Sequence, residues 1–461
     1  MVDHVLRILN GQKLYTSPSI EFVASIYAPL YFYVAAAISK ITGIGFFPLR
    51  LVSFISSLGS FITIYLIVKR ETTSSFAGVL ASCLFAATFQ ISSSWFDIAR
   101  VDNLFLFLLL IALYLIRFRN SSGSLVLAGV FISLSFLTKQ TALLIALPMM
   151  LYSFLRDRRS ANFFIFSSLL LMGGSTLILN YIHKGWYNFY LFDLPKQHPM
   201  DMGMLTTFWT QDILSHLSIA FIMGLVYLLT LLFSCDKETI FFYFLMAASM
   251  IGASWGSRIH VGGAENVLLP AYAAISILFG LAFHTVSQFI TAISTNKRNL
   301  LMASFLLLCT FQFYLLKYNP MRQIPTEEDL EAGRKFINIM SQIKGELFMP
   351  EHGYLPTLAG KNGYAFSMSI NDVIRSNAIE VKGTLLAEIR QNIQERRYAS
   401  VILSDFEPFQ KDYIEQYYKV ERKIFDSEDV FYPVAGLKRR PEYIYVPKNS
   451  VPIEINNDFL K

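Results

Sequence analysis

Apolar residues run in long stretches through most of the first 316 positions, interrupted by short polar segments. A membrane-spanning helix needs about 20 mostly apolar residues, because the hydrocarbon core of a bilayer is about 30 Å thick. This pattern predicts helices at 46–68, 74–95, 102–118, 123–138, 140–155, 161–182, 212–234, 239–256, 266–290 and 299–316. The pair 123–138 and 140–155 is separated only by Lys139, which predicts a tight hairpin or helices tilted into a cavity.

The apolar stretch 27–42 is too short to be assigned by length alone, with about 16 residues. If it spans the membrane, the N-terminus is cytoplasmic; if it lies along the interface, the N-terminus is outside. Its three tyrosines and Pro29 favour an interfacial helix, because tyrosine is enriched at the membrane–water boundary.

The pattern changes near residue 320, where charges become frequent and apolar runs shorten. Thr326 followed by Asp329 predicts a helix start of the capping-box type. Apolar residues then recur at helical spacing, and strands are predicted at 346–349, 399–404 and 442–446. We expect three parts: an outer N-terminal segment with an interfacial helix (1–45), a transmembrane domain (46–316) and an extracytoplasmic α/β domain (317–461).

Composition supports an α-helical polytopic membrane protein. Charged residues make up 16% of the chain, against about 25% in a soluble domain, and the mean hydropathy is +0.45. The net charge of +6 does not indicate nucleic-acid binding, because the basic residues form no stripe. Cys83, Cys235 and Cys309 fit neither a zinc site nor a disulfide framework.

Lys and Arg in the short loops predict the orientation, because cytoplasmic loops carry an excess of them. The more basic loops alternate along the chain and contain Lys69–Arg70, Arg117 with Arg119, Arg156 with Arg158–Arg159, Lys237, and Lys297–Arg298. The opposite loops carry fewer: Arg100, Lys139, Lys184, Lys196 and Arg258. This bias predicts that everything after residue 316 lies outside the cytoplasm.

Four ionisable residues fall at segment ends that face the predicted outer side: Asp97, Arg100, Asp102 and Lys139. A charge near the membrane core is costly and marks a candidate functional site. Charges of both signs at one depth indicate a polar cavity for a charged, lipid-linked ligand. The structural alternative is a set of interfacial charges that snorkel or pair with one another.

Several segments, taken in order, carry a resemblance to a known family: Asp3, ILNGQKLY (8–15), YAPLYFY (27–33), PLR (48–50), FDIARVDNL (96–104) and FLTKQTALL (136–144). Their order, spacing and membrane placement resemble the integral-membrane glycosyltransferases of the GT-C fold. The closest group is the dolichyl-phosphate-mannose protein mannosyltransferase-like superfamily, which includes the bacterial aminoarabinose transferases. The resemblance covers about residues 3–290.

The resemblance implies a catalytic carboxylate in the first outer loop, and the matching residue is Asp3. A carboxylate can accept the proton of an acceptor hydroxyl that attacks the anomeric carbon of a sugar. The leaving lipid phosphate needs cations, for which Arg100 and Lys139 are the candidates. Asp97 and Asp102 could orient these cations, or Asp102 could contact the acceptor. A single displacement would invert the anomeric configuration. Without the resemblance, an Asp at position 3 indicates only a solvated terminus.

Two departures from the family pattern stand out. Relatives have a full membrane helix before the catalytic Asp, so we expect that the natural protein begins further upstream than Met1. Tyr27 occupies the place of a phosphate-contacting lysine in relatives, and Arg100, Lys139 or Arg258 would have to compensate for it.

Two outer segments hold further candidates. In SRIHVGGAENVLLPAYAA (257–274), Arg258, His260, Glu265 and Asn266 could contact sugar or phosphate, although Glu265 also suits a helix start. The long loop 183–211 is either functional or a passive connector. No protein-bound metal is predicted from the histidine spacing, and a divalent cation at the donor phosphate is the one cofactor considered.

The sequence therefore predicts an enzyme that transfers a sugar from a polyprenyl-phosphate donor to a glycan, lipid or protein acceptor. We expect it in a bacterial plasma membrane, with the reaction on the outer face. A transporter or flippase of polyprenyl-linked lipid is the alternative, although no internal repeat is seen. A third possibility is an inactive relative that acts as a scaffold.

Overall fold

The computed structural model describes residues 1–233 and 236–448, so Cys235 and the last part of the predicted domain 317–461 lie outside the described residues. The chain divides into two compact units. The membrane unit comprises Tyr27–Leu179 and Pro199–Tyr318, and the sheet unit comprises Met1–Ile26, Asn180–His198 and Asn319–Lys461. The N-terminal segment and part of the loop 183–211 thus cluster with the C-terminal residues, although they are far apart in sequence.

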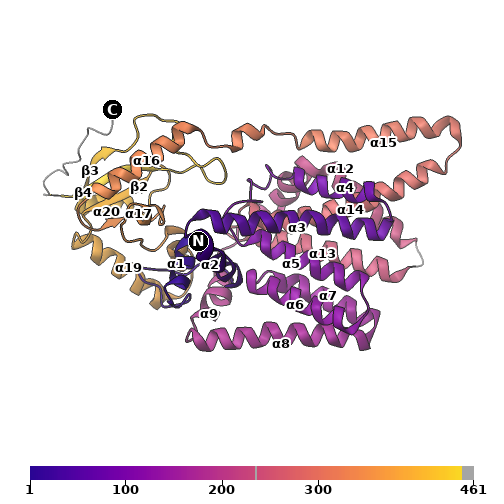
Figure 1. Cartoon of the computed structure of the whole chain (residues 1–461), viewed down its shortest axis with the longest axis horizontal. Coiled ribbons are helices and arrows are strands. Elements are labelled where there is room, and N and C mark those ends of the chain that lie inside the picture. Colours follow the sequence, from indigo (N-terminus) through magenta and orange to yellow (C-terminus); the bar gives the residue numbers. More distant parts are fainter. Residues whose placement is uncertain (234–235, 449–461) are drawn as a thin grey trace. The chain divides into compact units, whose positions relative to one another are not determined.

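The membrane unit is a bundle of helices (Figure 1). A helix lies at each of the ten predicted stretches: α3 (Phe46–Thr72), α4 (Ser75–Ala87), α5 (Asp102–Phe118), α6 (Ser122–Thr138), α7 (Ala142–Arg156), α8 (Arg158–Ile182), α12 (Ser215–Leu232), α13 (Lys237–Ile259), α14 (Leu269–Thr291) and α15 (Thr295–Leu315). Among the described residues, six helices are long and apolar enough to span a membrane, and four apolar helices are shorter.

The stretch predicted at 74–95 is helical only to Ala87. Beyond it, the Thr88 hydroxyl donates to the carbonyl of Phe85, and Ser93 and Ser94 adopt positive φ. Hydroxyl side chains offer the backbone local hydrogen bonds that compete with a continuing helix. The resulting non-helical segment leads to Arg100 and Asp102.

Helix α2 (Leu30–Thr42) has 13 residues, fewer than a span needs. Its tyrosine Tyr31 is buried and donates a 2.8 Å hydrogen bond to the carbonyl of Leu49, on α3. Tyr31 therefore packs between helices and does not lie at a membrane–water interface. Tyr33, by contrast, is exposed.

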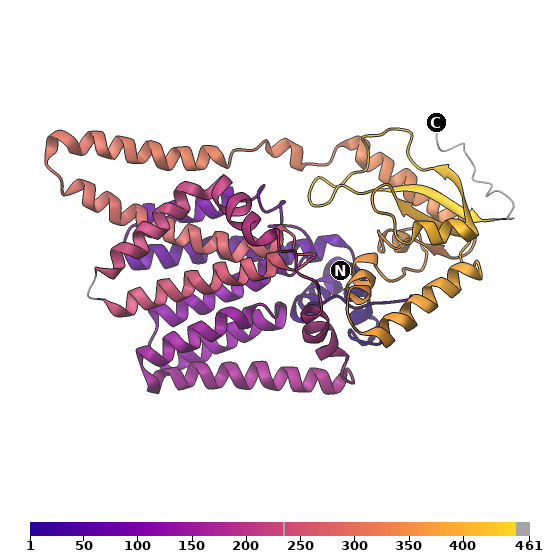
Figure 2. The ribbon, with the colours of Figure 1, turned by 180° about the vertical axis from the view of Figure 1, so that it is seen from behind.

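Helix α14 forms the centre of the membrane unit, because 94% of the most apolar stretch within Glu265–Thr291 is buried. A Cβ added at Gly280 would lie 2.7 Å from the Cβ of Ala81 on α4, so glycine permits this close approach. Helices α8 and α15 are far less buried and run along opposite edges of the unit (Figures 1 and 2). Their exposed apolar faces suit contact with lipid.

The sheet unit contains a four-stranded sheet in the order β1-β2-β4-β3, with helices packed beside it. Its strands are β1 (Leu347–Phe348), β2 (Ser400–Ser404), β3 (Tyr418–Lys423) and β4 (Pro441–Pro447). Strands β1 and β2 are parallel, whereas β4 is antiparallel to both β2 and β3. The three predicted strands are confirmed. Strand β3 was not predicted, because its sequence YKVERK is polar and lies at a sheet edge.

The helices of the sheet unit are α1 (Val2–Leu9), α9 (Trp186–Asn188), α10 (Leu194–Lys196), α16 (Glu327–Gln342), α17 (Leu355–Leu358), α18 (Ser367–Ile374), α19 (Ile379–Gln394) and α20 (Lys411–Tyr417). The predicted capping box of α16 is confirmed: the Thr326 hydroxyl accepts from the Asp329 amide at 3.1 Å, and the Asp329 carboxylate accepts from the Thr326 amide at 2.9 Å. Phe336 and Met340 of α16 pack into a core with Ile402 and Ile444 of the sheet.

Candidate functional site

Asp3 lies in the first turn of α1, where the helix dipole favours a negative charge. The helix ends at Asn10, and Gly11 follows with φ of +68°, a conformation that glycine adopts without strain. The amides of Gly11 and Gln12 donate to the carbonyls of Ile8 and Arg7, at 3.0 and 2.9 Å. These two bonds form a Schellman motif, so the NG pair of the family-like segment ends the helix that carries Asp3.

Two side chains of α1 fix its position in the sheet unit. The His4 imidazole is buried and accepts a 2.9 Å hydrogen bond from the Ser25 amide. Burial, together with the N-terminal charge and Arg7, holds the pKa of His4 well below its usual value, so the ring is neutral. The Arg7 guanidinium lies 4.1 Å from the Phe22 ring centroid. Both contacts tie α1 to the segment 19–25.

The Asp3 carboxylate lies beside two glycines of the C-terminal region. A Cβ added at Gly353 would be 3.6 Å from Asp3 Oδ2, and one at Gly363 would be 3.8 Å from Oδ1. Burial and the charge of Asp3 raise the pKa of Tyr354. No side chain or amide of the described residues donates a hydrogen bond to this carboxylate. Its oxygens therefore keep their capacity to accept a proton from a ligand.

Asp102 is the centre of the first polar cluster in the membrane unit. It begins α5 and is only 1% exposed. Its Oδ1 accepts from Lys139 Nζ at 2.7 Å and from Asn266 Nδ2 at 2.8 Å. Its Oδ2 is buried without a hydrogen-bond partner among the described residues. Lys139 lies just after α6, in the short connection to α7. Its contact with Asp102 agrees with one of the two alternatives considered for Asp102, that it orients a cation.

Arg100 precedes this cluster by two residues and has aromatic neighbours. Its Nη2 donates to the Tyr27 hydroxyl at 2.7 Å, and its guanidinium carbon lies 4.9 Å from the Trp95 ring centroid. Its Nε is buried without a hydrogen-bond partner, and no carboxylate of the described residues pairs with it. Arg100 thus brings a cation to Tyr27, the position at which the sequence resemblance implies a lysine.

Asp97 does not orient Arg100 or Lys139. Its carboxylate pairs with the Arg50 guanidinium, and Arg50 Nε also donates to the Asp97 carbonyl at 3.0 Å. Both side chains are substantially exposed. The Arg50–Asp97 pair therefore links segment 48–50 to segment 96–100.

Arg258 is held in a second cluster. Its Nε and Nη2 donate to Asp212 at 2.8 and 3.3 Å, and Glu265 accepts from Nη2 at 3.5 Å. The Gly263 carbonyl accepts from Nη1 at 2.5 Å. With two carboxylates beside it, Arg258 is less able than Arg100 to attract a further anion. Since Glu265 and Asn266 are neighbours, the short helix Glu265–Leu268 links this cluster to Asp102.

Asp212 was not among the predicted residues. It lies in a π-helical segment, Phe208–Leu214, that precedes α12. An acidic residue at the start of an apolar stretch was the available signal, but no pattern connects it with Arg258, 46 residues away. The pairing of Asp212 with Arg258 could be recognised only from the folded structure.

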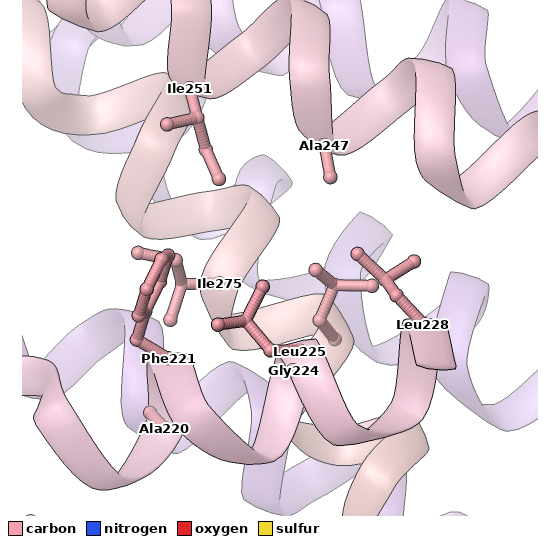
Figure 3. A pocket seen from close by; sticks show the side chains of 9 residues that line it. Ala220, Phe221, Gly224, Leu225, Leu228, Ala247, Ile251 and Ile275 are labelled. Carbon is pink, nitrogen blue, oxygen red and sulfur yellow. The ribbon is translucent and has the colours of Figure 1, made fainter. Parts of the chain in front are cut away.

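An apolar hollow of about 250 Å³, part of it open to the surface, lies between α12, α13 and α14 (Figure 3). Phe221, Leu225 and Leu228 line it from α12, and Ile251 lines it from α13. Ile251 is seven residues from Arg258, which corresponds to about 10 Å along a helix. A hydrocarbon chain suits such a surface.

The described residues contain no group of three or more His, Cys, Asp or Glu side chains that could hold a metal ion. A divalent cation at a donor phosphate stays a prediction.

Residues 27–183 match the family described as dolichyl-phosphate-mannose-protein mannosyltransferase. None of the curated proteins matches the chain. Among solved structures, ArnT from Cupriavidus metallidurans bound to undecaprenyl phosphate is 12% identical, with a TM-score of 0.60 over 97% of this chain and 92% of that one. An Archaeoglobus fulgidus oligosaccharyltransferase tethered to an acceptor peptide is 14% identical, with a TM-score of 0.56 over 87% and 64%. The chain therefore has the GT-C fold of these membrane transferases, as the sequence resemblance implied.

Proposed function

We propose that this protein is a membrane glycosyltransferase that moves a sugar from a polyprenyl-phosphate donor to an acceptor hydroxyl. The observation that carries the proposal is the set of cations at one end of the membrane unit. Arg100 lacks a carboxylate partner among the described residues, and Lys139 uses one of its three N–H donors on Asp102. Cations whose N–H groups are still available for hydrogen bonds suit the phosphate of a lipid-linked sugar.

In the proposed reaction, the Asp3 carboxylate accepts the proton of the acceptor hydroxyl. The hydroxyl oxygen forms a bond to the anomeric carbon, and the bond from that carbon to the phosphate oxygen breaks. Polyprenyl phosphate leaves with the electron pair, and Arg100 and Lys139 stabilise its charge. One displacement inverts the anomeric configuration. The lack of a hydrogen bond from any described residue to Asp3 supports its role as a base.

The apolar hollow of α12, α13 and α14 is the proposed place for part of the polyprenyl chain. The undecaprenyl phosphate bound by ArnT, which shares this fold, supports this class of donor. We place the reaction on the outer face of a bacterial plasma membrane, because the basic loops lie at the other helix ends. The acceptor is a glycan, lipid or protein.

The test is release of free polyprenyl phosphate from a panel of lipid-linked sugars by the purified protein in detergent. Asp3→Asn should abolish release. The matched control is Asp193→Asn, which neutralises an exposed carboxylate of the same unit and should leave release unchanged. Equal release by wild type and Asp3→Asn would reject Asp3 as the base. Lipid movement across vesicles without any release would support a transporter instead.

A further inference from the structure

A polar cavity lies at the other ends of the membrane helices, away from Asp102. It holds about 400 Å³, part of it open to the surface, between the ends of α5, α6, α7 and α8. Its polar lining includes Arg119, Asn120, Ser153 and Arg156, and its apolar lining includes Ile116 and Leu125. These loops are among the basic ones that predict the cytoplasmic side.

Three contacts fix the position of the Arg156 guanidinium, and some of its N–H groups remain available. Its Nη1 donates to the Ile116 carbonyl at 2.8 Å, its Nη2 to Asn120 Oδ1 at 2.6 Å, and its Nε lies 3.0 Å from Glu238. A guanidinium has five N–H donors, so two remain. Because Asn120 accepts through Oδ1, its amide NH₂ also remains available. A preorganised cation of this kind suits a planar or tetrahedral anion.

Two further groups of the cavity lack partners. The Ser153 hydroxyl is buried, with 5% of the residue exposed, and makes no hydrogen bond within the described part of the chain. An unsatisfied buried polar group is unfavourable, so a ligand atom that accepts from it would be stabilised. The exposed Arg119 guanidinium likewise makes no ion pair with the described residues.

The one carboxylate in the lining is already engaged. Asp157 accepts from the amides of Arg159 and Ser160 at 3.1 and 3.3 Å, and so caps the start of α8. Its backbone donors hold the negative charge at the helix end, where the dipole favours it. The remaining polar side chains of the cavity can all donate hydrogen bonds.

We propose that this cavity binds the phosphate group of an anionic phospholipid from the bilayer leaflet at this end of the helices. Basic pockets between membrane helices on the cytoplasmic side are suited to such headgroups. Large apolar side chains are exposed on two of the helices that line the cavity, namely Leu151 and Leu155 on α7 and Phe163 and Phe166 on α8. Acyl chains would lie against these, which favours a lipid over a free phosphate ion.

The experiment is native mass spectrometry of the purified full chain in detergent, titrated with phosphatidylglycerol and, in a separate arm, with inorganic phosphate. Wild type should retain one phosphatidylglycerol molecule, and Arg119→Gln should bind it at least about tenfold more weakly. Ser153→Ala should also weaken binding, while its thermal unfolding without added lipid stays that of wild type. The matched control is Lys297→Gln, which changes an exposed basic residue at the start of α15, on the same predicted side.

Retention of phosphatidylglycerol that depends on Arg119 and Ser153, with no response to inorganic phosphate, supports a lipid site. Retention of inorganic phosphate with the same dependence supports the phosphate site and assigns it to a free ion. Equal lipid retention by Arg119→Gln, Ser153→Ala and Lys297→Gln would overturn the proposal. Since no residue of this cavity takes part in the proposed transfer reaction, its failure would leave the proposed transferase activity untouched.

Discussion

At the scale of single residues, Arg100 has surroundings unlike those of an ordinary surface arginine. Its neighbours are the rings of Tyr27 and Trp95 rather than carboxylates. We expect Arg100→Gln to weaken binding of polyprenyl phosphate by about 10- to 150-fold, because a hydrogen bond to a charged group contributes about 1.5–3 kcal/mol. Equilibrium binding of the radiolabelled lipid measures this loss.

The control for this prediction is Arg50→Gln. Arg50 contacts the segment that carries Arg100 through Asp97, but its side chain is exposed and already paired with that carboxylate. Its loss should change lipid binding little, because exposed ion pairs contribute about 0–1 kcal/mol. An equal loss of affinity in both variants would mean that the charge acts at long range and not through contact.

The residues of the membrane clusters were only partly predictable. Asp102 and Lys139 could be found because both interrupt or bound apolar stretches, where any charge is conspicuous. The pairings of Asp97 with Arg50 and of Arg258 with Asp212 could not, since each joins segments 46 or 47 residues apart. Charge type and spacing suggest that a residue is unusual, but the helix packing decides its partner.

At the scale of elements, the turn after α13 depends on Gly263. A Cβ there would lie 2.4 Å from the carbonyl oxygen of Ser257. Because this is a backbone atom, relieving the clash requires a costly shift of the main chain. We expect Gly263→Ala to displace the turn that carries Glu265 and Asn266, and so to lower the thermal unfolding temperature and the affinity for the lipid donor. Differential scanning fluorimetry and lipid binding measure the two effects.

Gly252 provides the matched control for that turn, because it lies inside α13 and a Cβ there meets nothing within 4 Å. Alanine is favoured over glycine in a helix by about 1 kcal/mol, so Gly252→Ala should be neutral or stabilising. If both variants behaved alike, the close contact at Gly263 would not constrain the turn.

Element positions followed from the sequence more closely than element ends. Each long apolar stretch is helical, because the 3.6-residue pattern and length leave few alternatives. The end of α4 at Ala87 was missed, since the run of hydroxyl residues after it remains apolar enough to extend the stretch. Strand β3 was missed because an edge strand needs little burial on either face.

At the scale of the whole molecule, the parallel strands β1 and β2 end near the buried carboxyl group of Glu351 and the partly buried imidazole of His352. Burial raises the pKa of Glu351 to about 7, although Arg439 opposes this shift. An unfolded Glu titrates near about 4.3, so the folded state binds an extra proton between about pH 4.3 and 7. The contribution of Glu351 to the free energy of unfolding therefore falls as pH rises through that window.

Replacing Glu351 with Gln should remove this pH-dependent loss. Glu351→Gln is expected to protect the backbone of β1 and β2 from hydrogen exchange more than wild type does at pH 8, with a smaller difference at pH 4.5. Burial lowers the pKa of His352 to about 4, so its own contribution rises with pH between about 4 and 6.5. Each variant must therefore be compared with wild type at the same pH.

The control for the exchange measurement is Glu407→Gln, whose carboxylate is 73% exposed and 3.6 Å from Arg439. Neutralising an exposed carboxylate should leave exchange in β1 and β2 unchanged at both pH values. Equal protection of wild type and Glu351→Gln at pH 8 would show that the carboxyl group ionises without cost in the folded domain.

The grouping of Asp3 with the C-terminal sheet makes a prediction about the side of the membrane. Met1–Ile26 and Asn319–Lys461 belong to one compact unit, so a cysteine at position 3 and one at the exposed Glu327 must react from the same side. The basic loops predict that this side is outside, and that a cysteine at Arg119 or Lys297 reacts from the cytoplasm. Labelling of single-cysteine variants in intact cells with a membrane-impermeant maleimide, with Cys83 and the other native cysteines replaced, measures both. Labelling of positions 3 and 327 from opposite sides would contradict the grouping. Labelling of both positions from the cytoplasm alone would show that the predicted orientation is wrong, and with it the proposal that the transferase faces outward.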